Sequence, residues 1–171
     1  MINKKMEQAI NNQINAEFYS AYLYLAMAAD FESINLKGFA QWMRTQAMEE
    51  MTHGKKFYDF LMNRGGKVVL ADIKAPPKSW KTPLVAFQDA YKHEEKVTSL
   101  INELVDLSIE IKDYATNAFL QWFVNEQVEE ESSLNDIIHS MQLLDKNTAG
   151  LYQFDKELGL RLFVPPLGVT I

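Results

Sequence analysis

The chain of 171 residues contains no cysteine. Disulfide bonds, thiolate metal sites and cysteine nucleophiles are therefore excluded. The sequence also lacks a run of about 18 apolar residues, which a membrane-spanning helix requires. Its N-terminal stretch MINKKMEQAI has no apolar segment of the kind found in secretory signal peptides. We therefore expect a cytoplasmic protein that does not contact a membrane.

Residues that break helices are scarce, because the sequence has only 7 glycines and 5 prolines. Good helix formers such as Ala, Leu, Glu, Lys and Met are abundant, which favours an all-α protein. The composition, 47% hydrophobic and 23% charged, is ordinary for a folded globular protein, and we expect a single domain over residues 1–171. The net charge of −6 argues against general nucleic-acid binding.

Apolar residues recur at helical spacing in four long segments, which predict a four-helix bundle over about residues 5–145. The segments cover about residues 5–33, 39–64, 82–111 and 114–144. Gly65-Gly66 ends the second segment, and Thr82-Pro83 gives the third an N-cap followed by proline. Asn147 to Gly150 is expected to separate the bundle from a short C-terminal fifth helix at about residues 153–162.

The connection between the second and third helices, about residues 66–81, is much longer than the others. Its reach of roughly 50 Å exceeds the length of roughly 42 Å for a helix of about 28 residues. The chain can therefore cross the whole length of the bundle here, which predicts one long crossover between helices two and three. We expect Val68, Val69 and Leu70 to pack on the same bundle rather than on a second subunit.

Each helix presents one mainly apolar stripe to the bundle interior, and each stripe contains an acid. These acids are Glu17, Glu50, Glu94 and Glu130, and His53 follows Glu50 by one turn on the same face. At 1.5 Å per residue, all four acids fall roughly 17 to 24 Å from one end of the bundle. We therefore expect them to meet at one level of the interior.

Four carboxylates in an apolar core would repel one another and lose their hydration, which costs several kcal/mol for each uncompensated ion. The stripes place no Lys or Arg near them. A divalent cation would compensate these charges, and glutamate oxygens with one imidazole suit Fe, Mn or Zn. Several bridging carboxylates fit two metal ions better than one.

A simpler interpretation stays open beside the metal site. A lone Glu-x-x-His is a weak indication of metal binding, and a lone buried Glu more often bonds a tyrosine or a backbone group. A metal-free structural bundle whose carboxyls share protons predicts that Fe²⁺ or Zn²⁺ leaves the melting temperature unchanged. The joint pattern, one acid on each helix with an imidazole beside one of them, is far more specific and favours the metal site.

Four segments of the sequence resemble the non-haem bacterial ferritins, and the resemblance covers nearly the whole chain. They are NAEFYSAYLYLAM around Glu17 and Tyr24, EEMTH at 49–53, YKHEE around Glu94, and FLQWFVNEQVEEE at 119–131. The resemblance implies a ferritin-like four-helix bundle that forms a homo-oligomeric shell of 24 subunits. It also implies iron storage with ferroxidase activity: two Fe²⁺ ions bind in each bundle, dioxygen or hydrogen peroxide oxidises them, and Fe³⁺ is stored as an oxyhydroxide mineral.

The resemblance further implies a role for individual residues. The first iron ion falls on Glu17, Glu50 and His53. The second falls on Glu50, which bridges the two ions, together with Glu94 and Glu130, and with Gln127 alongside. A third, weaker iron site matches Glu49, Glu126, Glu129 and Glu130. Tyr24 is a candidate electron donor with a catalytic role, and its alternative role is a hydrogen bond to a carboxylate.

One departure separates this chain from the bacterioferritins, which carry a second Glu-x-x-His on helix four. Here the matching positions are Gln127 and Glu130, so the oxygen-rich second site favours iron that passes on to a mineral. Met51 occupies the position of their haem-ligating methionine, although we expect no haem. The alternative functions are a haem-binding bacterioferritin-like protein and a diiron oxidase or peroxidase that does not mineralise iron. Trp122 is expected to serve packing, and His93 and His139 to lie on the surface.

Overall fold

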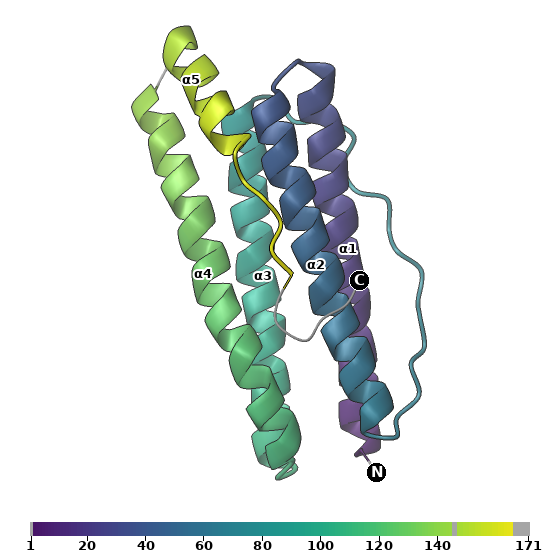
Figure 1. Ribbon diagram of the computed structural model, residues 1–171. Helices are drawn as coiled ribbons and strands as arrows, with labels where there is room; N and C mark the ends of the chain where they lie inside the picture. Colours follow the sequence, from purple (N-terminus) through teal and green to yellow (C-terminus); the bar gives the residue numbers. More distant parts are fainter. Residues whose placement is uncertain (1, 145–146, 166–171) are drawn as a thin grey trace.

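The structure is a computed structural model that describes residues 2–144 and 147–165 (Figure 1). In this part of the chain the secondary structure is entirely helical. The helices are α1 (Lys4–Ser33), α2 (Lys37–Asn63), α3 (Pro83–Glu110), α4 (Tyr114–Leu144) and α5 (Thr148–Leu158). The predicted all-α bundle with a short C-terminal helix is confirmed. None of the described helices is both long and apolar enough to cross a membrane.

The helices pack as two antiparallel pairs, α1 with α2 and α3 with α4, and α1 also contacts α3. A short turn joins the members of each pair, whereas the chain between α2 and α3 runs up the whole side of the bundle (Figure 1). Consequently α3 starts at the end where α1 finishes, and the predicted long crossover is confirmed.

Local signals in the sequence set the ends of these helices. The Thr82 hydroxyl accepts a hydrogen bond of 3.2 Å from the Val85 backbone N–H, so it caps α3 ahead of proline. Asn35, Gly65 and Lys112 have φ values of 62°, 70° and 57°, which place them in the left-handed region just after α1, α2 and α3. A left-handed residue at this position stops the helix and turns the chain.

Polar groups on α1 hold the crossover in place. The Asn11 amide donates to the Lys67 carbonyl at 3.0 Å and accepts from the Val69 N–H at 2.7 Å. Asn15 donates to the Ala71 carbonyl at 3.3 Å. Val68 packs against the bundle as predicted. The prediction is wrong for Val69 and Leu70, which are 56% and 64% exposed on this single chain, because polar bonds rather than apolar contacts fix the path of the segment.

The fifth helix begins earlier than the expected range of 153–162, because Asn147 is an N-cap rather than a breaker: its side chain accepts from the Gly150 N–H at 3.0 Å. The helix also ends earlier than expected, with Gly159 as its C-cap. One oxygen of Asp155 on α5 accepts from the N–H groups of Gly38 and Phe39, at 2.7 and 3.1 Å. α2 has no cap from its own sequence, so α5 supplies one. Gly38 permits this contact, because a Cβ there would lie 1.5 Å from the Asp155 carbonyl oxygen.

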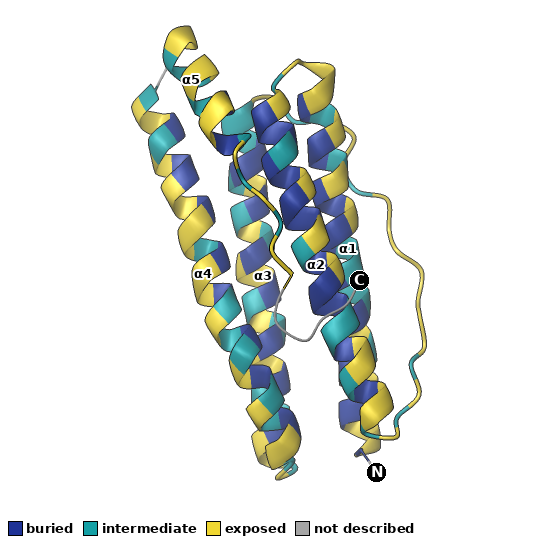
Figure 2. Ribbon diagram, viewed as in Figure 1, coloured by how far each residue is buried: buried dark blue, intermediate teal, exposed yellow. Residues whose placement is uncertain are grey.

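The interior consists of two apolar clusters separated by a polar layer. One cluster, near α5, includes Phe31, Phe39 and Phe87, and the other, near the opposite end, includes Ile10, Phe57 and Ile101. Buried residues recur at steps of three and four along each long helix, whereas the side of α4 that faces the viewer in Figure 2 is mostly exposed or intermediate. The four predicted acids lie in the layer between the clusters, so the apolar ends isolate that layer from solvent along the bundle axis.

Candidate metal centre

Glu17, Glu50 and His53 form the centre of the polar layer. Each offers one ligand atom, and these atoms lie within 4.8 Å of one another. The three residues are at most 3% exposed. The His53 Nδ1 atom lies 3.5 Å from a Glu50 oxygen, as expected for side chains one turn apart.

The Glu94 carboxylate reaches the same layer from α3 and is held by two neighbours. The Tyr24 hydroxyl donates to one of its oxygens at 2.5 Å, and the Gln127 amide donates to the other at 3.3 Å. Burial, and next the charge of Glu94, raise the pKa of Tyr24 well above its usual value. The phenol therefore keeps its proton and acts as a hydrogen-bond donor to this carboxylate.

The Glu130 carboxylate from α4 is linked to Glu50 through an amide. The Gln46 amide donates to a Glu130 oxygen at 2.6 Å and to a Glu50 oxygen at 3.2 Å. On α1, the Gln13 amide donates to Glu17 at 2.8 Å. Both glutamines lie four residues before the glutamate that they bond, which is the spacing of side-chain neighbours on a helix. These amides orient carboxylates without neutralising them.

The electrostatics of the layer favour uptake of positive charge. Burial, followed by the charge of Glu50, raises the pKa of Glu17 to about 8. Burial is also the main cause of the raised pKa of Glu50, Glu94 and Glu130. Each carboxyl binds a proton more tightly than in water, because the ion is poorly solvated and has acidic neighbours. A divalent cation can take the place of these protons.

Two buried oxygen atoms in the layer, Oε2 of Glu17 and Oε1 of Gln46, have no hydrogen-bond donor within the described chain. Buried polar atoms nearly always have a partner, so these oxygens need either a bound proton or a cation from outside the chain. Both orphans are oxygens beside other acidic groups, and a hard or borderline cation suits such donors. The residues present therefore fit a divalent metal ion.

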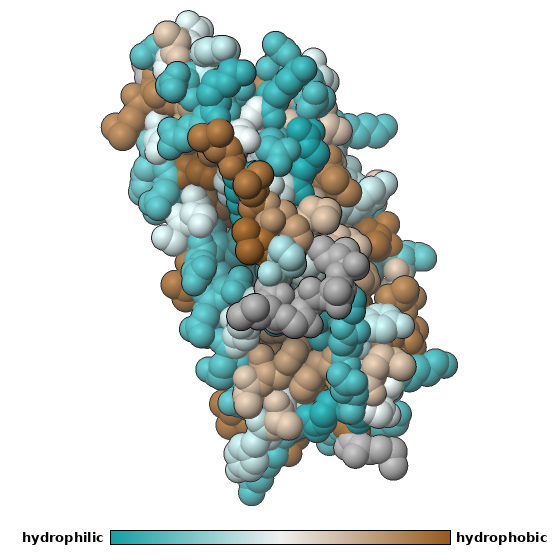
Figure 3. Space-filling view, viewed as in Figure 1, coloured by the Kyte–Doolittle hydropathy of each residue, from teal (hydrophilic) through white to brown (hydrophobic). Residues whose placement is uncertain are grey.

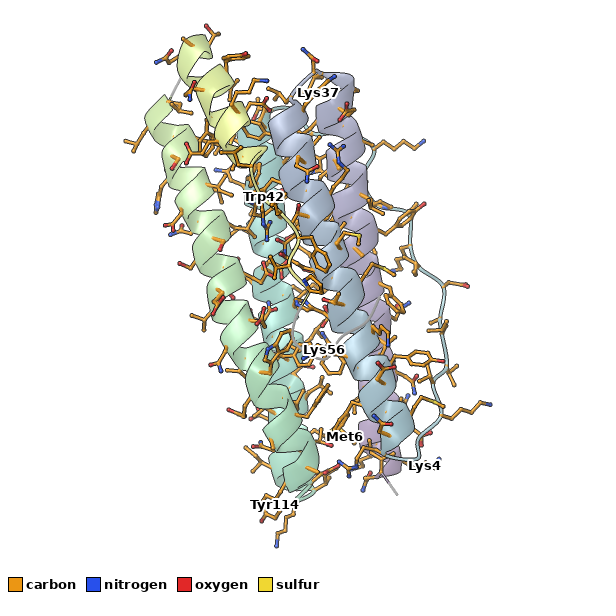
Figure 4. All side chains as sticks on the ribbon, in the orientation of Figure 1. Lys4, Met6, Lys37, Trp42, Lys56 and Tyr114 are labelled. Carbon is orange, nitrogen blue, oxygen red and sulfur yellow. The ribbon has the colours of Figure 1, made fainter. Side chains whose placement is uncertain are left out.

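A second acidic group lies beside this centre, between α2 and α4. His53, Glu126 and Glu130 each offer a ligand atom, within 4.8 Å of one another. They line a pocket of about 680 Å³ together with Glu49, Glu129, Lys56, Trp122 and residues that follow α5. Trp42 and Lys56, both labelled in Figure 4, lie along α2, which forms one wall. Glu49 differs from the other acids of the pocket, because it forms an ion pair with Arg161.

Several residues lie differently from the sequence-based interpretation or were missed by it. His93 is half-buried rather than fully exposed: its Nε2 atom lies 2.7 Å from the Ser20 hydroxyl, and burial, followed by the charge of Lys96, lowers its pKa to about 4. His139 is exposed as expected. Trp122 packs edge-on against the His53 ring. The amides of Gln13 and Gln46 were missed, although their spacing from Glu17 and Glu50 was a usable signal.

Buried carboxylates from four helices around one imidazole are typical of the carboxylate metal proteins built on four-helix bundles. Residues 7–144 match the sequence model of the family described as "Ferritin-like domain". The chain belongs to this family.

Two similar proteins from different bacteria carry the same name. The "Bacterial non-heme ferritin" of Bacteroides fragilis is 41% identical over 161 residues, which cover 94% of this chain and 100% of the relative. The protein of that name from Staphylococcus saprophyticus is 40% identical over 163 residues, covering 95% and 98%. These relatives are named as non-heme proteins, so the comparisons do not favour the haem-binding alternative.

Solved structures of archaeal ferritins share the fold. An engineered closed form of Archaeoglobus fulgidus ferritin is 52% identical, with a TM-score of 0.95 over 96% of this chain and 100% of that one. An open pore ferritin from the same organism is 51% identical, with a TM-score of 0.94 over 95% and 100%. The similarity to the bacterial proteins thus extends to archaeal ones.

Proposed function

We propose that this protein stores iron and oxidises it, as a cytoplasmic ferritin with ferroxidase activity. The observation that carries the proposal is the convergence of Glu17, Glu50 and His53 in a buried layer that contains an orphaned carboxylate oxygen. The names of the relatives, bacterial non-heme ferritins, support the same function.

Two Fe²⁺ ions are the substrates of the inner centre. Glu17, Glu50 and His53 would hold the first ion, and Glu50, Glu94 and Glu130, with Gln127 alongside, the second. The two ions give one electron each to dioxygen, which takes up two protons to form hydrogen peroxide and leaves two Fe³⁺ ions. The chain positions both ions, and the carboxyls with a raised pKa exchange their protons for metal.

The outer acidic pocket offers a third position and a route onward. Glu49, Glu126, Glu129 and Glu130 would bind a third iron ion more weakly, because Glu129 is exposed and Glu126 is half-buried. Fe³⁺ would then pass to an oxyhydroxide mineral inside a homo-oligomeric shell, for which we propose 24 subunits.

Removing single ligands tests the inner centre. We expect Glu50→Ala and His53→Ala to slow aerobic oxidation of Fe²⁺ by roughly tenfold or more, since even partners that only orient metal ligands commonly contribute that much. Glu95→Ala and His139→Ala are matched controls, because both side chains are exposed. Anaerobic titration with Fe²⁺ followed by air, tracked by absorbance and particle size, gives the rates. Wild-type rates in both ligand variants would refute the assignment.

The same experiment separates storage from a diiron oxidase or peroxidase. Growth of a mineral to many irons for each chain supports storage. A stable stoichiometry near two irons for each chain, with no change in particle size, would instead support the oxidase.

A further inference from the structure

The segment that follows α5 forms part of the wall of the outer acidic pocket. After Leu158 the chain leaves the helix and runs down beside α2 (Figure 1). Arg161, Val164 and Pro165 all line the pocket, together with the carboxylates of α2 and α4. Apolar atoms gather on the same face of the molecule, along the course of this segment below α5 (Figure 3). The pocket is thus bounded by a part of the chain that lies outside the bundle.

Arg161 attaches this segment to α2. Its guanidinium forms an ion pair with Glu49 and lies 4.2 Å from the centroid of the Trp42 ring. Its carbonyl accepts long hydrogen bonds of 3.4 and 3.5 Å from Gln41 and Thr45. Trp42, Thr45 and Glu49 recur at steps of three and four on α2, so one residue of the segment contacts a single face of the helix.

Apart from the contacts of Arg161, the described part of the segment is loosely attached. The Nη1 atom of Arg161 is buried and has no hydrogen-bond acceptor within the described chain, which costs free energy. The next residues hold the segment weakly, since Leu162 and Val164 are 77% and 75% exposed. Such a segment belongs to the part of a protein that opens at low free-energy cost.

We propose that Arg161 is a built-in counter-cation of the outer pocket, and that a metal ion bound there releases Arg161 together with its segment. This inference rests on the proposed function, because it assigns the outer acids to a metal ion. Glu49 either accepts the guanidinium or contributes to a metal site beside Glu126 and Glu130. Metal occupancy and docking of the segment are therefore linked, and each weakens the other by the same factor.

Zinc, which is not oxidised, can be used to test whether the docked Arg161 weakens metal binding. Titration of the metal-free full-length protein by calorimetry gives the affinity for each equivalent. We expect Arg161→Gln to tighten the third, weakest equivalent by about fivefold or more, the lower end of coupling between sites, and to leave the first two unchanged. Arg44→Gln removes the same charge from a surface pair with Glu32, at 3.1 Å, and is expected to behave as wild type.

The linkage also predicts that metal binding exposes the Arg161 guanidinium. A dicarbonyl reagent that is specific for arginine measures this exposure. The chain has three arginines, so each can be followed by mass spectrometry. We expect the third zinc equivalent to speed modification of Arg161 but not of Arg64, which is paired with Asp113 at 3.0 Å outside the pocket. In Glu49→Gln, Arg161 should react without zinc at the rate of the exposed Arg44. Glu129→Gln lacks an acid of the outer pocket that Arg161 does not contact. In this variant, zinc should not change the rate at which Arg161 is modified.

The outcomes separate this inference from the proposed function. Loss of the first two zinc equivalents would overturn the metal centre itself. If those equivalents bind, but Arg161→Gln has wild-type affinity for the third and Arg161 modification ignores zinc, then only the role of Arg161 is overturned.

Discussion

The Glu17 carboxyl makes the stability of the metal-free protein depend on pH. Burial, followed by the charge of Glu50, raises its pKa from 4.5 to about 8. Between these values the folded protein binds this proton more tightly than the unfolded chain does. The stabilisation is complete below the unfolded value of 4.5 and is lost as the pH rises through about 8.

Replacing this carboxyl with a neutral amide isolates its contribution. Through Glu17 alone, the free energy of unfolding should fall by about 1.4 kcal/mol per pH unit across the interval. We therefore expect the free energy of unfolding of Glu17→Gln, measured in urea with a chelator present, to depend less steeply on pH than that of the wild type. Glu95→Gln, which removes an exposed acid, should keep the wild-type slope. Equal slopes in wild type and Glu17→Gln would contradict the buried, proton-binding state.

Tyr24→Phe distinguishes the two roles of the tyrosine. The hydroxyl bonds Glu94 at 2.5 Å in a buried place, so its loss leaves a buried acceptor unsatisfied. We expect the metal-free variant to be less stable by about 1–3 kcal/mol in urea unfolding. If Tyr24 also donates an electron, stopped-flow absorbance will show slower iron oxidation with both ions still bound. Unchanged oxidation at reduced stability would restrict Tyr24 to the hydrogen bond.

At the scale of elements, α5 and the start of α2 depend on one close contact. Gly38 is within the first turn of α2, and alanine normally favours a helix over glycine, by about 1 kcal/mol in a helix interior. A Cβ at this position would instead collide with the Asp155 carbonyl oxygen. The sign of the stability change in Gly38→Ala therefore reports whether α5 is docked.

We expect Gly38→Ala to destabilise the protein, and Asp155→Ala to cost about 0.5–2 kcal/mol through loss of the cap on Gly38 and Phe39. Hydrogen exchange should rise in α5 in both variants, while the four long helices stay protected. Glu157→Ala, at an exposed position of the same helix, is the control. A stabilised Gly38→Ala would show that α5 leaves this site in solution.

The elements differ in how well the sequence predicted them. The four long helices were predictable because apolar residues at steps of three and four identify the inner face of each helix. The same stripes placed Glu17 and Glu130 at about the same distance along the bundle. The ends of α5 were not predictable, since an asparagine such as Asn147 can either end one helix or cap the next, and α5 also depends on the contact of Asp155 with Gly38 and Phe39. The ion pair of Arg161 could not be predicted from the sequence, because its segment has no helical periodicity and its partner, Glu49, is 112 residues away. His93 was misjudged because its hydrogen-bond partner, Ser20, lies on another helix, 73 residues away.

At the scale of the whole molecule, the outer side of α1 and α2 carries a cluster of exposed apolar side chains. Phe18, Tyr22, Leu25, Met51 and Ile73 surround a hollow of about 420 Å³. Tyr22 and Leu25 are 50% and 48% exposed on the single chain. A cluster of exposed apolar side chains of this kind marks an interaction surface. A second copy of the chain is the partner that the proposed shell supplies.

Leu25→Glu tests this assembly surface without disturbing the metal centre, because Leu25 follows the inward-facing Tyr24 and points about 100° away from it around the helix. In a two-fold contact between copies the substitution appears twice, so two carboxylates would be placed in an apolar interface. We expect light scattering to show particles much smaller than the wild-type oligomer, while circular dichroism stays helical. Leu25→Ala keeps the surface uncharged and should retain most of the assembly. A Leu25→Glu protein with wild-type particle mass would place the contacts of the shell on other faces of the bundle.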